Sequence, residues 1–322
     1  MEVTFLNICE PNSGLYVVPF SYYEFFKIKG IKVRWVNLAW DKNVNFNGDV
    51  IKFHHFFGSG YSVNSIINVI VQRYDGINGI KIYTDPRLMP KNDGKELMII
   101  HDFFRPANGL DAWKHKRVLK ALKREKTRVI TNSKLTAEMA REKGLNVVSE
   151  LYTHYGYEYN SNVAKEKLVL SIGTNISRKR PDLILNFLNG LEEEWSFIRI
   201  GGDLREIGEI RTKANYIYKE RVTLEELNSI YEKSMYLFLP SESEGLGLPM
   251  IEALHHNVAV VANIKNKVLK EFSFPNVISV QNDDDFHLPP PPRAEEFALF
   301  RNWYRNNIER QFKIILETIE GI

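Results

Sequence analysis

Short apolar runs alternate with longer amphipathic stretches along this chain, and this alternation constrains the fold more than any other feature. Val and Ile are frequent in the runs, which in the first half lie at residues 3–8, 31–37, 49–55, 80–84, 97–101, 128–132 and 147–151. Several are separated by stretches of helical length, such as 61–74 and 133–143, the second with Ser133 as a suitable N-cap and Gly144 at its end. Strands that alternate with helices in this way predict parallel βαβ units.

The same alternation restarts in the second half. Apolar runs follow at residues 167–173, 196–202, 216–218, 235–240, 258–262 and 276–280. A polar, tyrosine-rich segment at 153–166 separates the halves, and four prolines at 289–292 precede a last helical stretch at 293–319. We therefore expect two α/β domains with parallel sheets, at residues 1–157 and 158–299. Ligands of such sheets bind beyond the carboxyl ends of the strands.

The composition excludes several classes of protein. One cysteine among 322 residues cannot form an internal disulfide or a cysteine-rich metal site. Hydrophobic residues make up 44% and charged residues 26%, as in ordinary globular proteins, and the net charge of +3 is too balanced to indicate a nucleic-acid partner. No apolar run approaches the ~18–20 residues of a membrane span, and the N-terminus lacks the pattern of a secretory signal, so we expect a cytoplasmic protein.

Two glutamates bracket a glycine-rich turn in the segment LPSESEGLGLPMIEALHHNVAVVA, at residues 239–262. The pattern predicts a strand end, a loop, a helix and a further strand. Glu244 lies in the loop, Pro249 suits the first helical turn, and Glu252 follows on the helix near the same edge. The alternative is an ordinary helix start whose acidic residues are favoured by the helix dipole.

The turn between these glutamates is suited to hold an anion. Its glycines let a ligand approach the backbone closely, and the amides at the start of the helix can hold phosphate oxygens. Carboxylates accept hydrogen bonds from vicinal hydroxyl groups, so a nucleotide diphosphate sugar accounts for both kinds of group. The residues of the turn that we expect to contact such a donor are Gly245, Leu246, Gly247 and Leu248.

This segment resembles the signature of retaining glycosyltransferases with the GT-B fold, in particular glycosyltransferase family 4, also called group 1. The family pattern is a serine, then E-G-x-G-L-P, and a second glutamate eight positions after the first; here it stands as Ser241 and EGLGLPMIE at 244–252. In the family the first glutamate contacts the donor sugar and the second contacts the ribose, which implies these roles for Glu244 and Glu252. Asn257 stands where the family usually has glycine, and asparagine tolerates a left-handed helix end.

The segment LVLSIGTNISRKRPDLIL at 168–185 is similar to the first strand and loop of the family's second domain. The resemblance implies that Lys179 binds the donor diphosphate, whose negative charge grows as the glycosidic bond breaks. Thr174 stands where the family usually has arginine, and Arg178 and Arg180 flank the lysine, where they can compensate. Thr174 and Arg178 are therefore also expected donor contacts. The alternative is a solvated basic loop.

Two residues of the first half have a weaker resemblance to the family. His101 ends the apolar run 97–101, where the family often has a histidine near the reacting sugar, and a histidine satisfied within its loop is the alternative. In the mechanism proposed for the family, the donor's own phosphate oxygen takes the acceptor proton, so His101 is a candidate catalytic residue but not a general base. Gly14 follows the first strand, where the family has a glycine-rich loop that contacts donor and acceptor. A plain turn fits this lone glycine equally well.

The segment WKHKRVLKALKREKTR, from Trp113 to Arg128, is strongly basic. As a helix it places Val118, Leu119 and Leu122 on one stripe, which suits packing on the first sheet. Two interpretations of its charges stay open: a solvated basic face, or peripheral contact with anionic lipid or another anionic partner. No stacking or groove-reading motif accompanies the basic residues, which disfavours nucleic acid.

Taken over the chain, the resemblance implies a GT-B fold of two Rossmann-like domains facing across a cleft, with the C-terminal helix, about residues 300–322, returning to the first domain. It implies a metal-independent, retaining glycosyltransferase without a cofactor, which uses a UDP- or GDP-linked sugar and a glycan, lipid or protein acceptor. The alternatives are a nucleotide-sugar epimerase or phosphorylase and a non-catalytic nucleotide-sugar-binding protein. A dehydrogenase is disfavoured because no G-x-G-x-x-G follows the first strand.

Overall fold

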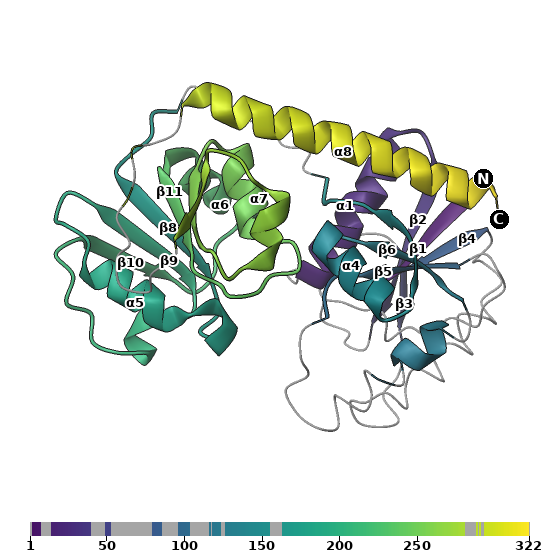
Figure 1. Cartoon of the computed structure of the whole chain (residues 1–322), viewed down its shortest axis with the longest axis horizontal. Helices are drawn as coiled ribbons and strands as arrows, with labels where there is room; N and C mark the ends of the chain where they lie inside the picture. The colour runs from purple at the N-terminus through teal and green to yellow at the C-terminus, as the bar shows by residue number, and fades with distance from the viewer. Residues whose placement is uncertain are drawn as a thin grey trace. The chain divides into compact units, whose positions relative to one another are not determined.

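The computed structural model describes residues 2–7, 14–39, 49–52, 79–85, 96–103, 116, 118–123, 126–154, 163–280, 288, 290 and 293–321. The chain divides into two compact units (Figure 1), the first formed by Met1–Tyr155 with Asn306–Ile322 and the second by Gly156–Arg305. The α/β fold class with two parallel sheets is confirmed, and each expected strand has a counterpart among the described residues. The expected helix at 61–74 lies outside them.

The first unit contains a seven-stranded sheet in the order β3-β2-β1-β4-β5-β6-β7, and all its neighbouring strands are parallel. Strand β5 is buried along its whole length, as expected for an inner strand of a parallel sheet covered on both faces. The strands are β1 (Glu2–Asn7), β2 (Lys32–Ala39), β3 (Asp49–Lys52), β4 (Ile80–Tyr83), β5 (Glu96–Ile100), β6 (Arg128–Thr131) and β7 (Asn146–Glu150).

Two of the helices in this unit are α1 (Gly14–Ile28) and α4 (Lys134–Glu142). Helix α4 begins as expected, because the Ser133 hydroxyl accepts a hydrogen bond from the Thr136 N–H at 3.1 Å. The sequence pattern does not predict α1, since it begins with glycine and contains Pro19, which removes a helical hydrogen bond. Tertiary packing of its aromatic side chains overrides this weak propensity.

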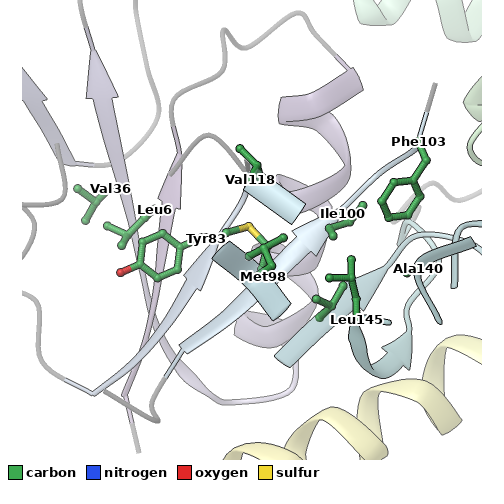
Figure 2. Close-up of a cluster of buried hydrophobic side chains, with 11 residues drawn as sticks. Leu6, Val36, Tyr83, Met98, Ile100, Phe103, Val118, Ala140 and Leu145 are labelled. Atoms are coloured by element: carbon green, nitrogen blue, oxygen red, sulfur yellow. The ribbon is translucent and has the colours of Figure 1, made fainter. Parts of the chain in front are cut away.

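A cluster of buried apolar side chains forms part of the core of the first unit (Figure 2). Strands supply Leu6, Met98 and Ile100, and the basic segment supplies Val118 and Leu122, with Leu119 partly buried against them. The predicted apolar stripe of that segment is therefore confirmed, although only residues 116, 118–123 and 126–128 of it are described. Its apolar face is a core element of the first unit.

The second unit contains a six-stranded parallel sheet in the order β10-β9-β8-β11-β12-β13. Its strands are β8 (Leu168–Gly173), β9 (Ser196–Gly201), β10 (Asn215–Lys219), β11 (Tyr236–Leu239), β12 (Ala259–Asn263) and β13 (Val277–Val280). Its α-helices are α5 (Pro181–Asn189), α6 (Leu224–Lys233) and α7 (Leu248–His255), and its 3₁₀ helices are η1 (Ser177–Lys179), η2 (Leu204–Glu206) and η3 (Lys267–Glu271).

The long helix α8 (Ala294–Glu320) contributes residues to both units (Figure 1). Its buried side chains recur every three or four positions, which is the spacing of one helical face. In the part that belongs to the second unit, Phe300 packs against His255, with ring centroids 5.3 Å apart. In the part that belongs to the first unit, Phe312 packs against Phe25 and Phe26, with centroids 4.9 and 4.8 Å apart. The expected return of the last helix to the first domain is confirmed.

Candidate active site

Strands β8 and β11 are neighbours, so the loops that follow them meet at one edge of the second sheet. The Glu242 N–H donates to the Arg178 carbonyl oxygen at 2.9 Å. The guanidinium of Arg178 in turn donates to the Ser243 carbonyl oxygen, also at 2.9 Å. These bonds join η1 to the loop after β11, and they place the two segments singled out from the sequence side by side.

Lys179 and Glu244 form an ion pair within this junction. Their side chains are only 14% and 8% exposed, which weakens solvent screening between them. Arg178 lies further from the same carboxylate, with Nη1 3.5 Å from Oε2 of Glu244. The structure thus brings together three predicted site residues: two cations that can hold phosphate oxygens, and a carboxylate that can accept hydrogen bonds from hydroxyl groups.

Thr174 and Arg180 lie near these three residues in the sequence but have other surroundings. Thr174 is exposed just after the end of β8. Arg180 has a left-handed backbone, with φ of +52°, and its guanidinium binds Asp182 and Glu242. The hydrogen bonds from Arg180 lower the pKa of the Asp182 carboxyl group. Arg180 therefore links the start of α5 to the loop after β11 through hydrogen bonds. Of the two arginines that flank Lys179, Arg178 is the one that contacts Glu244.

The glycine-rich turn leads directly into α7. Gly247 is the N-cap residue, and its φ of +77° is a conformation that L side chains rarely adopt. A Cβ atom there would meet only ordinary contacts, the nearest at 3.6 Å from Met250, so the backbone angle rather than lack of space requires glycine. The first turn of a helix has no intrahelical acceptors for its N–H groups, which leaves the amides of Gly247 and Leu248 suited to bind an anion.

Glu252 lies on α7, where a tyrosine that the sequence did not single out binds it. The hydroxyl of Tyr231 donates to Oε2 of Glu252 at 2.8 Å. The Tyr231 ring is buried and stacks on His256 at an interplanar angle of 9°. Nothing in the sequence signals this contact, because Tyr231 occupies an apolar position of α6 and its partner lies 21 positions away.

His101 and Gly14 belong to the first unit. His101 follows β5 and is buried, with Nε2 3.2 Å from the Thr84 carbonyl oxygen and no hydrogen-bond partner at Nδ1. Burial lowers the pKa of this imidazole, which keeps the ring neutral. Gly14 is the first residue of α1, and residues 8–13 before it lie outside the described part.

The described residues show neither a cluster of metal ligands nor a membrane-spanning helix. No group of three or more His, Cys, Asp or Glu side chains suited to a metal ion occurs among them. Within the same residues, no helix combines the length and the apolar character that crossing a membrane requires.

Comparisons with known proteins concern the family and the fold. Residues 158–298 match the family model described as "Glycosyl transferases group 1". A stretch of 121 residues is 31% identical to an uncharacterized 41.2 kDa protein in the cps region of Klebsiella pneumoniae. That match covers 37% of this chain and only 32% of the relative's length.

Three solved structures illustrate the similarity of fold. The lipopolysaccharide outer core galactosyltransferase WaaB is 14% identical, with a TM-score of 0.62, over 99% of this chain and 95% of its own. The Anabaena protein Alr3699/HepE, in complex with UDP and glucose, is 12% identical, with a TM-score of 0.65, over 99% and 94%. An α,α-trehalose-phosphate synthase from Burkholderia xenovorans is 11% identical, with a TM-score of 0.69, over 99% of each chain.

At these identities the structural neighbours establish the fold alone, and the family model matches residues 158–298. They do not favour an epimerase, a phosphorylase or a non-catalytic binding protein. The chain has the GT-B fold, and its residues 158–298 match the model of group 1 glycosyl transferases.

Proposed function

We propose that this protein is a retaining glycosyltransferase that moves a sugar from a nucleotide diphosphate sugar to an acceptor. The observation that carries the proposal is the ion pair of Lys179 and Glu244, largely buried beside the carboxyl ends of β8 and β11. A cation and a carboxylate in contact match a ligand whose diphosphate adjoins a hydroxyl-rich sugar.

In this proposal the second unit binds the donor. Lys179 and Arg178 contact the diphosphate together with the amides of Gly247 and Leu248, and they stabilise the negative charge of the leaving group. Glu244 accepts hydrogen bonds from the sugar, and Glu252 accepts them from the ribose. Structures of the Anabaena neighbour contain UDP and glucose, or UDP-glucose, which supports a UDP-linked donor over a GDP-linked one.

The chemistry requires neither a metal nor a general base from the protein. Lys179 supplies the positive charge that a metal would otherwise provide, and the donor's phosphate oxygen takes the acceptor proton. His101 contributes as a neutral ring near the reacting sugar, held by the hydrogen bond from Nε2 to the Thr84 carbonyl oxygen. Gly14 and Thr174 complete the proposed donor contacts through their backbones.

The acceptor that we favour is a glycan, either free or attached to a lipid. One structural neighbour is a lipopolysaccharide galactosyltransferase, and the Klebsiella relative is encoded in a cps region. We retain peripheral contact of residues 113–128 with anionic membrane at the cytoplasmic face as part of the proposal. Binding to phosphatidylglycerol vesicles but not to phosphatidylcholine vesicles would support it.

The test is a donor screen followed by a transfer assay. Thermal shifts against nucleotide sugars and free nucleotides identify the donor, because a ligand of the native state raises its stability. Glu244→Gln and Lys179→Met are then expected to lower transfer at least ~100-fold, since each removes a charged contact to the donor. Transfer by the wild type is expected to persist in EDTA and to give a product with the donor's anomeric configuration.

The exposed pair Lys167 and Glu194 supplies matched controls in the same unit. Lys167→Met and Glu194→Gln should leave transfer within about 2-fold of wild type, because exposed ion pairs contribute little. Full activity of Glu244→Gln and Lys179→Met, or an inverted product, would refute the proposed site or mechanism.

A further inference from the structure

Arg199 is a fully buried arginine in the middle of β9. Among the described residues, no carboxylate forms an ion pair with its guanidinium, and its hydrogen bonds go to neutral acceptors. Burial lowers the pKa of Arg199 to about 10, so the side chain keeps its charge at neutral pH. A buried charge is costly unless its hydrogen bonds are satisfied, which makes the groups that Arg199 binds informative.

The guanidinium of Arg199 binds three acceptors near the carboxyl ends of β8 and β9. Nε donates to the Gly202 carbonyl oxygen at 3.0 Å, Nη1 to the Ser171 hydroxyl at 2.9 Å, and Nη2 to Oδ1 of Asn175 at 3.3 Å. The planar guanidinium therefore joins strand β8, the end of β9 and the loop after β8. Lysine has a single nitrogen and could not reach all three acceptors.

Asn175 is fixed at both ends of its side-chain amide. While Oδ1 accepts from Arg199, Nδ2 donates to the Asp203 carbonyl oxygen at 2.7 Å and to the Glu206 carboxylate at 3.2 Å. The amide also lies against Gly202, where a Cβ atom would come within 2.4 Å of Cγ of Asn175. The loop after β8 is thus pressed onto the end of β9 with no space for a side chain between them.

This loop runs directly into η1, which contains Lys179. The Lys179 N–H donates to the Ile176 carbonyl oxygen at 2.9 Å. The aliphatic part of Lys179 lies over Gly173, where a Cβ atom would be 3.8 Å from Cδ of the lysine. The position of residues 173–176 therefore determines where the ammonium group of Lys179 can reach.

We propose that Arg199 is a positioning residue for Lys179: by holding Asn175 and Gly202, it fixes residues 173–176 and so presents the lysine to the donor diphosphate. Arg199 itself is buried and does not touch the donor. The inference rests on the proposed function, and it assigns the selectivity of the site for a nucleoside diphosphate over a monophosphate to this buried network. Because Thr174 within this loop is uncharged, that selectivity depends strongly on Lys179.

The test compares the dissociation constants of UDP and UMP, and of GDP and GMP, by calorimetry. Asn175→Ala breaks the link without removing the buried charge. We expect it to weaken diphosphate binding about 5–10-fold and monophosphate binding less than about 2-fold, because Lys179 loses its placement and the base and ribose contacts remain. Arg199→Met, which preserves side-chain volume, should lower the diphosphate preference at least as much.

Two further variants separate positioning from a general structural role. Asn189→Ala is the matched control, because Asn189 also bridges backbone groups in the second unit, at Glu209 and Arg211, and it should leave the preference unchanged. In a Lys179→Met background, Asn175→Ala should change the preference less than about 2-fold, since no lysine remains to be positioned.

An unchanged diphosphate preference in Asn175→Ala would overturn the proposal, and so would an equal loss of monophosphate and diphosphate binding. If Arg199→Met fails to fold, Asn175→Ala decides the outcome. A wild-type protein that binds none of the nucleotides would instead refute the proposed function. If the wild type binds the nucleotides and the variants keep its diphosphate preference, only the role of Arg199 is refuted.

Discussion

The hydroxyl group of Tyr231 orients Glu252, which we propose as the residue that binds the ribose of the donor. It binds one oxygen of Glu252 at 2.8 Å, and burial of the ring against His256 fixes its direction. A carboxylate has two oxygens with several lone pairs, so Glu252 can keep this bond while it accepts hydrogen bonds from the hydroxyl groups of a ribose. The Tyr231 O–H is therefore one of the groups that orient Glu252.

At the same scale we predict the effect of Tyr231→Phe. The change removes the hydrogen bond to a charged group, which is worth ~1.5–3 kcal/mol, and part of this should appear as weaker nucleotide binding. We expect the affinity for the ribonucleotide to fall about 5-fold and the preference for UDP over 2′,3′-dideoxy-UDP to shrink. Calorimetric titration with both ligands measures the two quantities.

Tyr22→Phe is the matched control for this prediction. The Tyr22 hydroxyl also binds a buried partner, the Leu151 carbonyl oxygen, but in the first unit. Its loss should lower stability without changing nucleotide preference. A Tyr231→Phe protein with wild-type discrimination between the two nucleotides would show that Glu252 needs no such partner.

Individual site residues differ in how far the sequence predicts them. Glu244 and Lys179 are predictable, because their residue types and spacing within short segments carry the resemblance. Tyr231 and Arg199 are not, because their roles depend on partners that only the folded sheet brings near. A lone arginine within the apolar run of β9 is a signal that sequence reasoning could have used, since buried strands rarely contain an unpaired charge.

At the scale of elements, strands are more predictable than helices here. Parallel strands buried on both faces are continuous apolar runs, which the sequence displays directly. Helix α1 contradicts its local propensity, and its stability comes from aromatic contacts with distant segments. Helix α7 ends as the sequence predicted: Asn257 adopts φ of +55° in place of the family's glycine, and its side chain also binds Arg301 on α8.

For helix α8 we predict that Phe312→Ala destabilises the first unit. Phe312 is buried against Phe25 and Phe26, and removal of a buried phenylalanine ring typically costs ~3–5 kcal/mol. Hydrogen exchange should show lower protection in α1 and β1, whereas nucleotide affinity of the second unit should change little. Exposed Lys313, changed to alanine, is the neighbouring control. Unchanged protection in α1 would contradict the assigned packing.

For the whole molecule we predict a loss of stability in mild acid. Burial lowers the pKa of His101, His154 and His256, the last from 6.5 to about 4, with a further contribution from the positive Lys165. Each ring therefore binds a proton more readily in the unfolded chain. Stability is full above about pH 6.5 and decreases as the pH falls towards 4; for His256 alone the loss at about pH 5 is of order 2 kcal/mol.

Urea unfolding at about pH 7.5 and at about pH 5 measures this dependence. His256→Phe keeps an aromatic ring against Tyr231 but cannot be protonated, so its stability should fall less between the two pH values. A variant with the full wild-type dependence would assign the effect to other groups.

The overall architecture was predictable because its information is local and repeated: two series of apolar runs, each with helices between. The membership of α8 in both units followed from the family resemblance and not from the apolar pattern, since the spacing of Phe300 and Phe312 on one stripe shows that the face is buried but not by which partners. Those partners lie far away along the chain, as with Ser149 and Gln311, which are 162 positions apart and hydrogen-bonded.

This separation has a consequence for synthesis on the ribosome. All seven strands of the first sheet have been synthesised by residue 150. The aromatic side chains of α1 cannot make their native contact with Phe312 until that residue has also been synthesised. During translation of the entire second unit, the first must persist as an unfinished core with apolar surface open to solvent. Nascent chains of this protein should therefore recruit chaperones until the last helix has left the exit tunnel.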